Sequence, residues 1–149
     1  MDNAFDLTVN ALRRKGLSSD QILEELSKLF QGFANLANQY EISVETKIRT
    51  MLKQLGMPID IDGYNHWVCA IEIYNSTTEQ LNMQDIYKRV AEKCGIKPKR
   101  VERTMRFAVE RAFNNCEDEK VKETFAKCIS AKTGRPKNRQ FLVILSEQI

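Results

Sequence analysis

The chain has 149 residues, of which 23 are Lys or Arg and 20 are Asp or Glu, so its formal net charge is +3. This length usually forms one domain, and a hydrophobic content of 42% is too high for a disordered chain. The longest apolar run, Phe141 to Leu145, is far shorter than the roughly 20 residues of a membrane-spanning helix. Because the acidic start, Met1 to Asp6, also lacks the features of a secretory signal, we expect a cytoplasmic protein without a membrane partner.

Apolar residues recur mainly at intervals of three and four, and Gly and Pro are sparse at 6 and 3, which predicts an all-α fold. Residues 1–41 are expected to form a short helical N-terminal arm, with helices over about 3–15 and, after a Ser18–Gln21 capping box, to about 34. A loose connection is expected at 35–42, and Ser43 is expected to cap the next helix. In the multi-helix domain that follows, helices are expected over about 43–55, 64–74, 81–94, 98–113 and 118–129, and from 139 past Leu145.

The positive charge is confined to the second half of the sequence. The net charge is −2 over residues 1–41, −2 over 42–83, +5 over 84–114 and +2 over 115–149. Most of the excess lies in two short stretches, 97–106 and 132–139. This asymmetry suggests a polyanionic partner, although a solvated helix face and a loop would also account for a basic segment.

Residues 87–106 have the residue types that a helix-turn-helix requires. Ala91 allows the second helix to cross closely, Gly95 tolerates the positive φ of a sharp turn, and Ile96 can fill the angle between the helices. Pro98 suits the first turn of the second helix, where its missing N–H is not needed. We therefore predict a helix-turn-helix whose second helix, 98–113, enters the major groove of DNA.

A helical projection of residues 98–113 separates an apolar arc from a basic face. The arc holds Val101, Met105, Ala108, Val109 and Ala112. On the other side, Arg100 and Arg103 are long enough to contact guanine, and Glu102 can accept from cytosine or orient a neighbouring arginine. The residues whose reach suits phosphates are Lys97, Lys99 and Arg106 on or before this helix, and Lys132, Arg135, Lys137 and Arg139 in the second basic stretch. Phe107 could meet a thymine methyl group or cover a neighbouring helix.

From about Ile42 to the end, the sequence resembles the C-terminal effector domain of the sporulation master response regulator family. The resemblance rests on Gly56-Met57-Pro58 with Gly63-Tyr64, on Tyr87, Ala91, Lys93 and Gly95, on Arg100-Val101-Glu102-Arg103 with Arg106 and Ala108, and on Ala131-Lys132, Pro136-Lys137-Asn138 and Phe141. It implies a six-helix domain over 42–149 that binds a DNA box of the TGTCGAA type. It also places Arg100, Glu102, Arg103 and Arg106 on the helix that reads the bases.

The resemblance further implies a receiver domain before the effector, whereas residues 1–41 are helical in pattern and show no alternation of strands and helices. We therefore expect no control by receiver phosphorylation. The arm has an apolar stripe formed by Ile22, Leu26, Leu29, Phe30 and Phe33. This stripe predicts either a surface for a homodimer or a related regulator, or packing onto the chain's own effector domain.

The sequence holds no pattern typical of catalysis. His66 is the single histidine and is expected to be a packed or surface residue, and no phosphate-binding glycine loop is present. The four cysteines, expected as free thiols mostly in or near the core, form no CxxC pair. We therefore predict no enzyme, cofactor, metal or small-molecule substrate, and a nucleoid-associated, sequence-specific regulator that binds double-stranded DNA. The alternative is a protein-interaction module that binds or titrates a full-length regulator, with weak DNA binding of its own.

Overall fold

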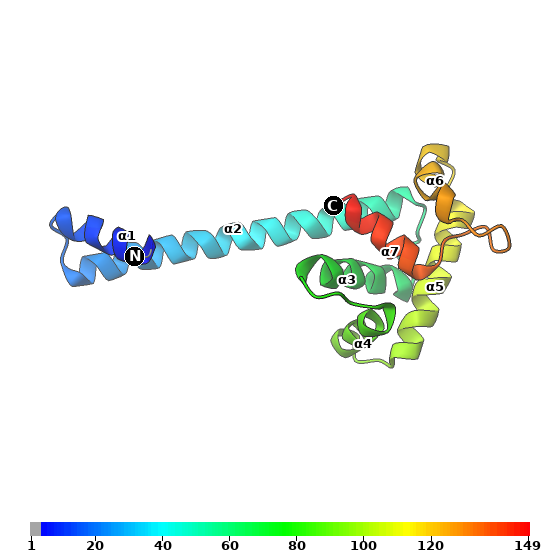
Figure 1. Ribbon diagram of the computed structural model, residues 1–149, viewed down its shortest axis with the longest axis horizontal. Coiled ribbons are helices and arrows are strands. Elements are labelled where there is room, and N and C mark those ends of the chain that lie inside the picture. The colour runs from blue at the N-terminus through cyan, green and yellow to red at the C-terminus, as the bar shows by residue number, and fades with distance from the viewer. Residues whose placement is uncertain (1–3) are drawn as a thin grey trace. The chain divides into compact units, whose positions relative to one another are not determined.

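The structure, a computed structural model, describes residues 4–149, apart from the side chains of residues 41 and 42. These residues form seven α-helices and one short 3-10 helix, and no strand occurs among them (Figure 1). The elements are α1 (Ala4–Arg14), α2 (Ser19–Gln54), α3 (Asp62–Ser76), α4 (Met83–Cys94), α5 (Pro98–Asn115), α6 (Glu119–Phe125), the 3-10 helix Ala126–Cys128, and α7 (Asn138–Glu147). The predicted all-α fold is confirmed. Within residues 4–149, no helix combines the length and apolarity that crossing a membrane requires.

Helix α2 runs without a break through residues 35–42, so the predicted loose connection there and the predicted helix start at Ser43 are wrong. The prediction gave too much weight to Asn35, Asn38 and Gln39, which lower helix propensity only slightly. Neither Gly nor Pro occurs between Gly32 and Gly56, so nothing in this stretch breaks the helix. Past its end, Gly56 has the positive φ of +74° that is typical of a helix C-terminus.

The chain divides into two compact units, unit 1 (Met1–Ile42) and unit 2 (Ser43–Ile149). In unit 1, α1 and α2 are joined by a short turn in which the predicted capping box is present. Ser18 Oγ accepts from the Gln21 N–H at 3.3 Å, and Gln21 Oε1 accepts from the Ser18 N–H at 2.8 Å. Asn3, where the first helix was expected to start, lies outside the described residues.

Unit 2 is organised around α3, which contacts α4, α5 and α7. Trp67 on α3 is fully buried, and its ring meets that of Phe141 on α7 edge-on, with centroids 4.6 Å apart. Phe125, from α6, stacks on Phe141 at 5.5 Å and so joins α6 to the same aromatic cluster. These contacts fix the positions of the helices that surround α5.

The four cysteines are free thiols, and three of them are at least half-buried in unit 2. Cys116 is buried, Cys69 and Cys128 are half-buried, and Cys94 at the end of α4 is exposed. The expectation of free thiols mostly in or near the core is therefore confirmed.

Candidate functional site

The turn between α4 and α5 has the geometry that its residue types predict. Gly95 adopts a left-handed conformation with φ +66°, and its N–H caps α4 on the Ala91 carbonyl. A Cβ at Gly95 would meet nothing within 4 Å, so the backbone conformation, and not lack of space, requires glycine. Ile96 is half-buried in the angle, and Pro98 is the first residue of α5. The turn therefore sets the direction in which α5 leaves α4.

The inner face of α5 is fully packed in the core of unit 2. Its five predicted core residues, Val101, Met105, Ala108, Val109 and Ala112, are each at most 1% exposed. Phe107, by contrast, is 50% exposed, so half of its side chain is open to a partner. Since the inner face is fixed, the basic side chains must project from the opposite side.

Helix α5 lies very close to α3. A Cβ on Gly63 of α3 would come within 2.3 Å of the Thr104 carbonyl oxygen, so the two backbones can approach only because this residue is glycine. Trp67 donates its indole N–H to the Met105 carbonyl at 2.9 Å. These two contacts hold α5 against the buried helix α3.

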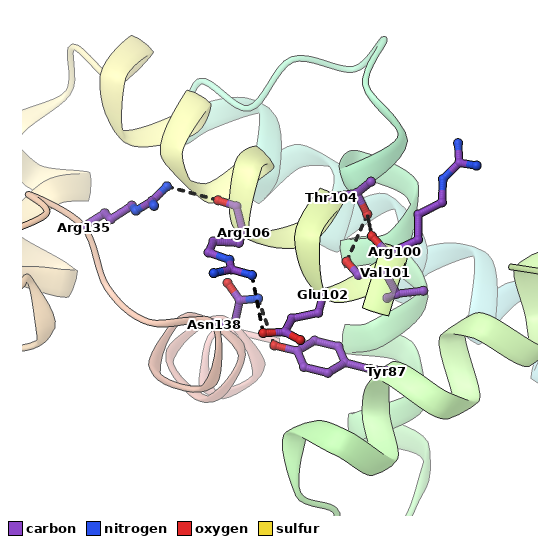
Figure 2. Close-up of polar contacts among 8 residues, drawn as sticks. All are labelled: Tyr87, Arg100, Val101, Glu102, Thr104, Arg106, Arg135 and Asn138. Carbon is purple, nitrogen blue, oxygen red and sulfur yellow. Dashed lines mark hydrogen bonds and ion pairs between the residues drawn. The ribbon is translucent and has the colours of Figure 1, made fainter. Parts of the chain in front are cut away.

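His66 Nδ1 lies 2.7 Å from the Thr104 hydroxyl oxygen. That hydroxyl is 3.0 Å from the carbonyl oxygens of Arg100 and Val101, to which it can only donate (Figure 2). Its oxygen therefore accepts from His66, which assigns the proton to Nδ1. Burial lowers the pKa of His66, Asp62 partly opposes this shift, and Arg100 adds to it. His66 is thus a packed residue that is neutral at pH 7.

We call Lys97, Lys99, Arg100, Arg103 and Arg106 the basic face of α5; all five residues are exposed. Within the described part of the chain, the side chains of Lys97, Lys99 and Arg103 form no hydrogen bond or ion pair. Arg100 pairs with Asp62 at 3.4 Å, but both side chains are 63% exposed, so the pair is weak. Figure 2 shows the Arg100 side chain pointing away from Arg106 and its neighbours. The N-terminal part of this face is therefore available to a ligand.

Arg106 belongs to a polar cluster at the middle of α5. Its guanidinium lies 3.5 Å from the carboxylate of Glu102, a half-buried residue (Figure 2). Of the two roles predicted for Glu102, this geometry matches the orientation of a neighbouring arginine. Tyr87 on α4 lies beside Glu102 in the same view, and its hydroxyl accepts from the Asn138 side chain at 2.9 Å. Burial raises the pKa of Tyr87, so this hydroxyl stays protonated.

The second basic stretch contacts α5 through Arg135. One guanidinium nitrogen of Arg135 donates to the Glu110 carboxylate at 2.6 Å and to the Arg106 carbonyl at 3.3 Å. Its side chain is only 20% exposed. Arg135 therefore attaches the loop over 130–137 to α5, at the carbonyl of Arg106 and the side chain of Glu110.

The other three predicted phosphate contacts of this stretch differ in their surroundings. Lys132 and Lys137 are exposed, and their side chains have no partner among the described residues. Arg139 donates to the Leu81 carbonyl at 3.0 Å, which links the start of α7 to the loop before α4. The structure thus brings the two stretches together and leaves two lysines of the second one free.

Sequence reasoning missed the protein partners of Arg135 and Arg139. Glu110 and Leu81 lie 25 and 58 residues away from them along the chain, so no local spacing indicates these contacts. Groups of three or more His, Cys, Asp or Glu side chains able to hold a metal ion do not occur among residues 4–149.

The comparison with known protein families matches the part of the chain that contains this site. The model of the family described as "Sporulation initiation factor Spo0A C terminal" matches residues 48–149, about two-thirds of the chain. The matched segment includes α3 to α7, the basic face of α5 and the second basic stretch.

Proposed function

The chain belongs to the family of Spo0A C-terminal domains, and from this membership we propose that it is a sequence-specific regulator that binds double-stranded DNA. The family consists of DNA-binding domains of sporulation regulators and not of enzymes, so DNA binding and transcription regulation are its general role. Such a role implies a location in the cytoplasm, at the nucleoid. The specific proposal concerns how α5 reads DNA.

The observation that supports this proposal best is the division of α5 into a buried face and a basic one. The major groove of B-DNA is wide enough to admit an α-helix, and the helix must present long hydrogen-bonding side chains to the base edges. Helix α5 presents Arg103 without a protein partner and Arg100 with only a weak one. We assign both to base readout, with the preceding turn and α4 forming the rest of a helix-turn-helix on a TGTCGAA-type box.

Glu102 and Arg106 complete the proposed set of base-reading residues. Because their side chains lie 3.5 Å apart, Glu102 would help to orient Arg106 toward the DNA, and Arg106 would carry the contact. The carbonyl of Arg106 is in turn fixed by Arg135. Specificity at this position would therefore depend on Arg106, which touches DNA, and on Glu102 and Arg135, which support it.

Phosphate contacts are assigned first to the unpartnered lysines, which are Lys97, Lys99, Lys132 and Lys137. Contacts of this kind position a protein on the duplex without reading its sequence. Arg135 and Arg139 already bind the protein's own backbone, so their direct contact with phosphate would require them to share or leave these partners. We assign both primarily to holding the basic loop and α7 in place.

Residues 4–42 consist of α1 and part of α2 with the turn between them, and they contain no strand from which a receiver could be built. We propose that this segment does not supply phosphorylation control and instead contacts a protein, either a second copy or a related regulator. Its exposed apolar side chains also favour a second candidate function, in which the chain binds or titrates a full-length regulator and binds DNA only weakly.

The two candidates differ in how the chain alone binds DNA. Fluorescence anisotropy with a duplicated TGTCGAA-type duplex and a scrambled duplex, at about 150 mM salt, compares them directly. A DNA-binding regulator binds the first duplex more tightly, and its affinity falls as salt rises. Equal, weak binding of both duplexes, or a specific complex that forms only with an added regulator, would favour the second candidate. Selection from a random duplex pool then identifies the preferred sequence without assuming the box.

A further inference from the structure

Large exposed hydrophobic side chains are concentrated in unit 1. Ten such side chains occur in the described part of the chain, and eight of them belong to this unit. They are Phe5, Leu7, Leu23, Leu29, Phe30, Phe33, Leu36 and Tyr40, with exposures from 50% to 71%. Six of the eight lie on α2 between Leu23 and Tyr40, and large apolar surfaces exposed on a monomer mark interaction sites.

The apolar residues of α2 follow a heptad repeat up to Tyr40. Ile22, Leu26, Leu29, Phe33, Leu36 and Tyr40 are separated by alternating intervals of four and three, which is the spacing of a and d positions. Leu23 and Phe30, seven residues apart, add a third apolar position beside this seam. Three apolar positions per heptad are typical of a helix in a bundle, whereas a two-stranded coiled coil needs two.

Helix α1 is too short to cover this face. With 11 residues it is about 16 Å long, whereas the stretch of α2 from Ser19 to Tyr40 is about 33 Å long. Accordingly, Ile22 near the turn is 6% exposed, while Phe33 is 68% exposed and Tyr40 is 71% exposed. The half of the stripe farther from the turn has no cover within unit 1.

We propose that a second copy of this chain covers the stripe, so that α1 and residues 19–40 of α2 from each copy form a four-helix bundle. Charge permits self-association, because residues 29–40 contain no charged side chain and residues 4–40 hold four acidic and four basic groups. The segment that would form the bundle, residues 4–40, therefore carries no net charge that would oppose the pairing of two copies. A partner selected by charge would find no complementary groups along the seam.

The exposed area also matches what a stable dimer needs. Eight large side chains, each with roughly 100 Å² still exposed, give roughly 800 Å² on each copy. This is about the area that each partner buries in a specific protein–protein interface. The inference deepens the proposed function, since it names the partner of residues 4–42.

Sedimentation equilibrium of the full chain, from about one to tens of micromolar, tests the proposal. We expect the wild-type chain to be a dimer at the upper concentrations. The double variant Phe33→Glu, Leu36→Glu should raise the dimer dissociation constant at least about 100-fold, because it places charges in the buried seam. The matched control, Gln31→Glu with Asn38→Glu, adds the same charge on the opposite side of α2 and should change the constant by less than about 3-fold.

A wild-type chain that stays monomeric at tens of micromolar would overturn the proposal, whether the stripe is covered by the chain's own unit 2 or by a different protein. A dimer that survives both seam substitutions would also overturn it. The wild-type measurement does not depend on how well the variant folds, and circular dichroism of the variant shows whether α2 remains helical. Anisotropy with a single box gives a separate readout, so that a monomer that binds DNA refutes only the dimer, and a dimer that binds no duplex refutes only the proposed function.

Discussion

The Thr104 hydroxyl accepts a hydrogen bond from Nδ1 of His66 across 2.7 Å, and this contact joins helix α5 to the buried helix α3. The Thr104 hydroxyl in turn donates to the backbone carbonyls of Arg100 and Val101, one turn earlier in α5. The N-terminal turns of α5 are therefore attached to the core through the Nδ1 hydrogen bond of a neutral imidazole. The protonation state of this imidazole therefore affects both the stability of unit 2 and the position of α5 against α3.

Acid should destabilise unit 2 through His66. Burial lowers the pKa of His66 in the folded protein below its ordinary value of 6.5, so the unfolded chain takes up the proton more readily. The stabilising contribution is complete above about pH 6.5 and is lost as the pH falls below it toward the folded pKa. We would measure the free energy of unfolding in urea at about pH 7.5 and about pH 5.5. Its decrease between the two pH values should be smaller in His66→Gln than in the wild type. An equal fall in both proteins would contradict this assignment, since the chain has no other histidine.

Gly63→Ala should destabilise unit 2 and weaken DNA binding together. The added methyl group would lie 2.3 Å from the Thr104 carbonyl and 2.6 Å from the Ala108 side chain, so α5 would have to move away from α3. Overpacking of this kind costs about 1–3 kcal/mol, measurable by thermal unfolding and circular dichroism. Gly32→Ala, where nothing lies within 4 Å, serves as the control and should be neutral or stabilising by up to about 1 kcal/mol. Equal effects of the two substitutions would refute the close approach.

Arg135 and Glu110 should be coupled in stability measurements. Their 2.6 Å ion pair is partly shielded, with side-chain exposures of 20% and 50%, so a double-mutant cycle with alanine should give about 0.5–1 kcal/mol. Arg111→Ala provides the comparison, because Arg111 is an exposed arginine of the same helix with no partner among the described residues. A coupling near zero would show that the loop over 130–137 is held by other contacts.

Arg103 and Lys137 should affect DNA binding in different ways. Arg103→Ala should cost about 1–3 kcal/mol on the preferred duplex and little on a scrambled one, because a base contact is lost. Lys137→Ala should weaken binding to both duplexes alike and reduce the salt slope by about one, because a phosphate contact is lost. Anisotropy titrations at several salt concentrations measure both effects. If both variants lost affinity equally on the two duplexes, the division between base and phosphate contacts would be wrong.

Local rules predicted most of α5 and its turn from the sequence. The buried arc from Val101 to Ala112, the left-handed Gly95 and the initial Pro98 each follow from helix periodicity or from the backbone preference of a single residue. The Ser18–Gln21 capping box is equally local and was found for the same reason. Features that depend on one residue or on the periodicity of a single helix could thus be predicted from the sequence.

Contacts between distant segments could not be predicted from the sequence in this way. His66 with Thr104, and Arg135 with Glu110, become neighbours only once α3, α5 and the basic loop are packed together. The continuity of α2 was missed for a different reason, since the polar residues at 35–42 resemble a connection in composition although none of them ends a helix. The polar composition of residues 35–42 therefore led us to predict two helices where helix propensity allows the single helix α2.

The single tryptophan of the chain lies directly beneath the helix proposed to read DNA. Its indole is fully buried and hydrogen-bonded to the backbone of that helix at Met105, so its fluorescence depends on how that helix is seated. Any ligand or substitution that lifts α5 would let water reach the ring and shift the emission to longer wavelengths. The protein thus contains an intrinsic optical reporter that allows titration without an attached dye.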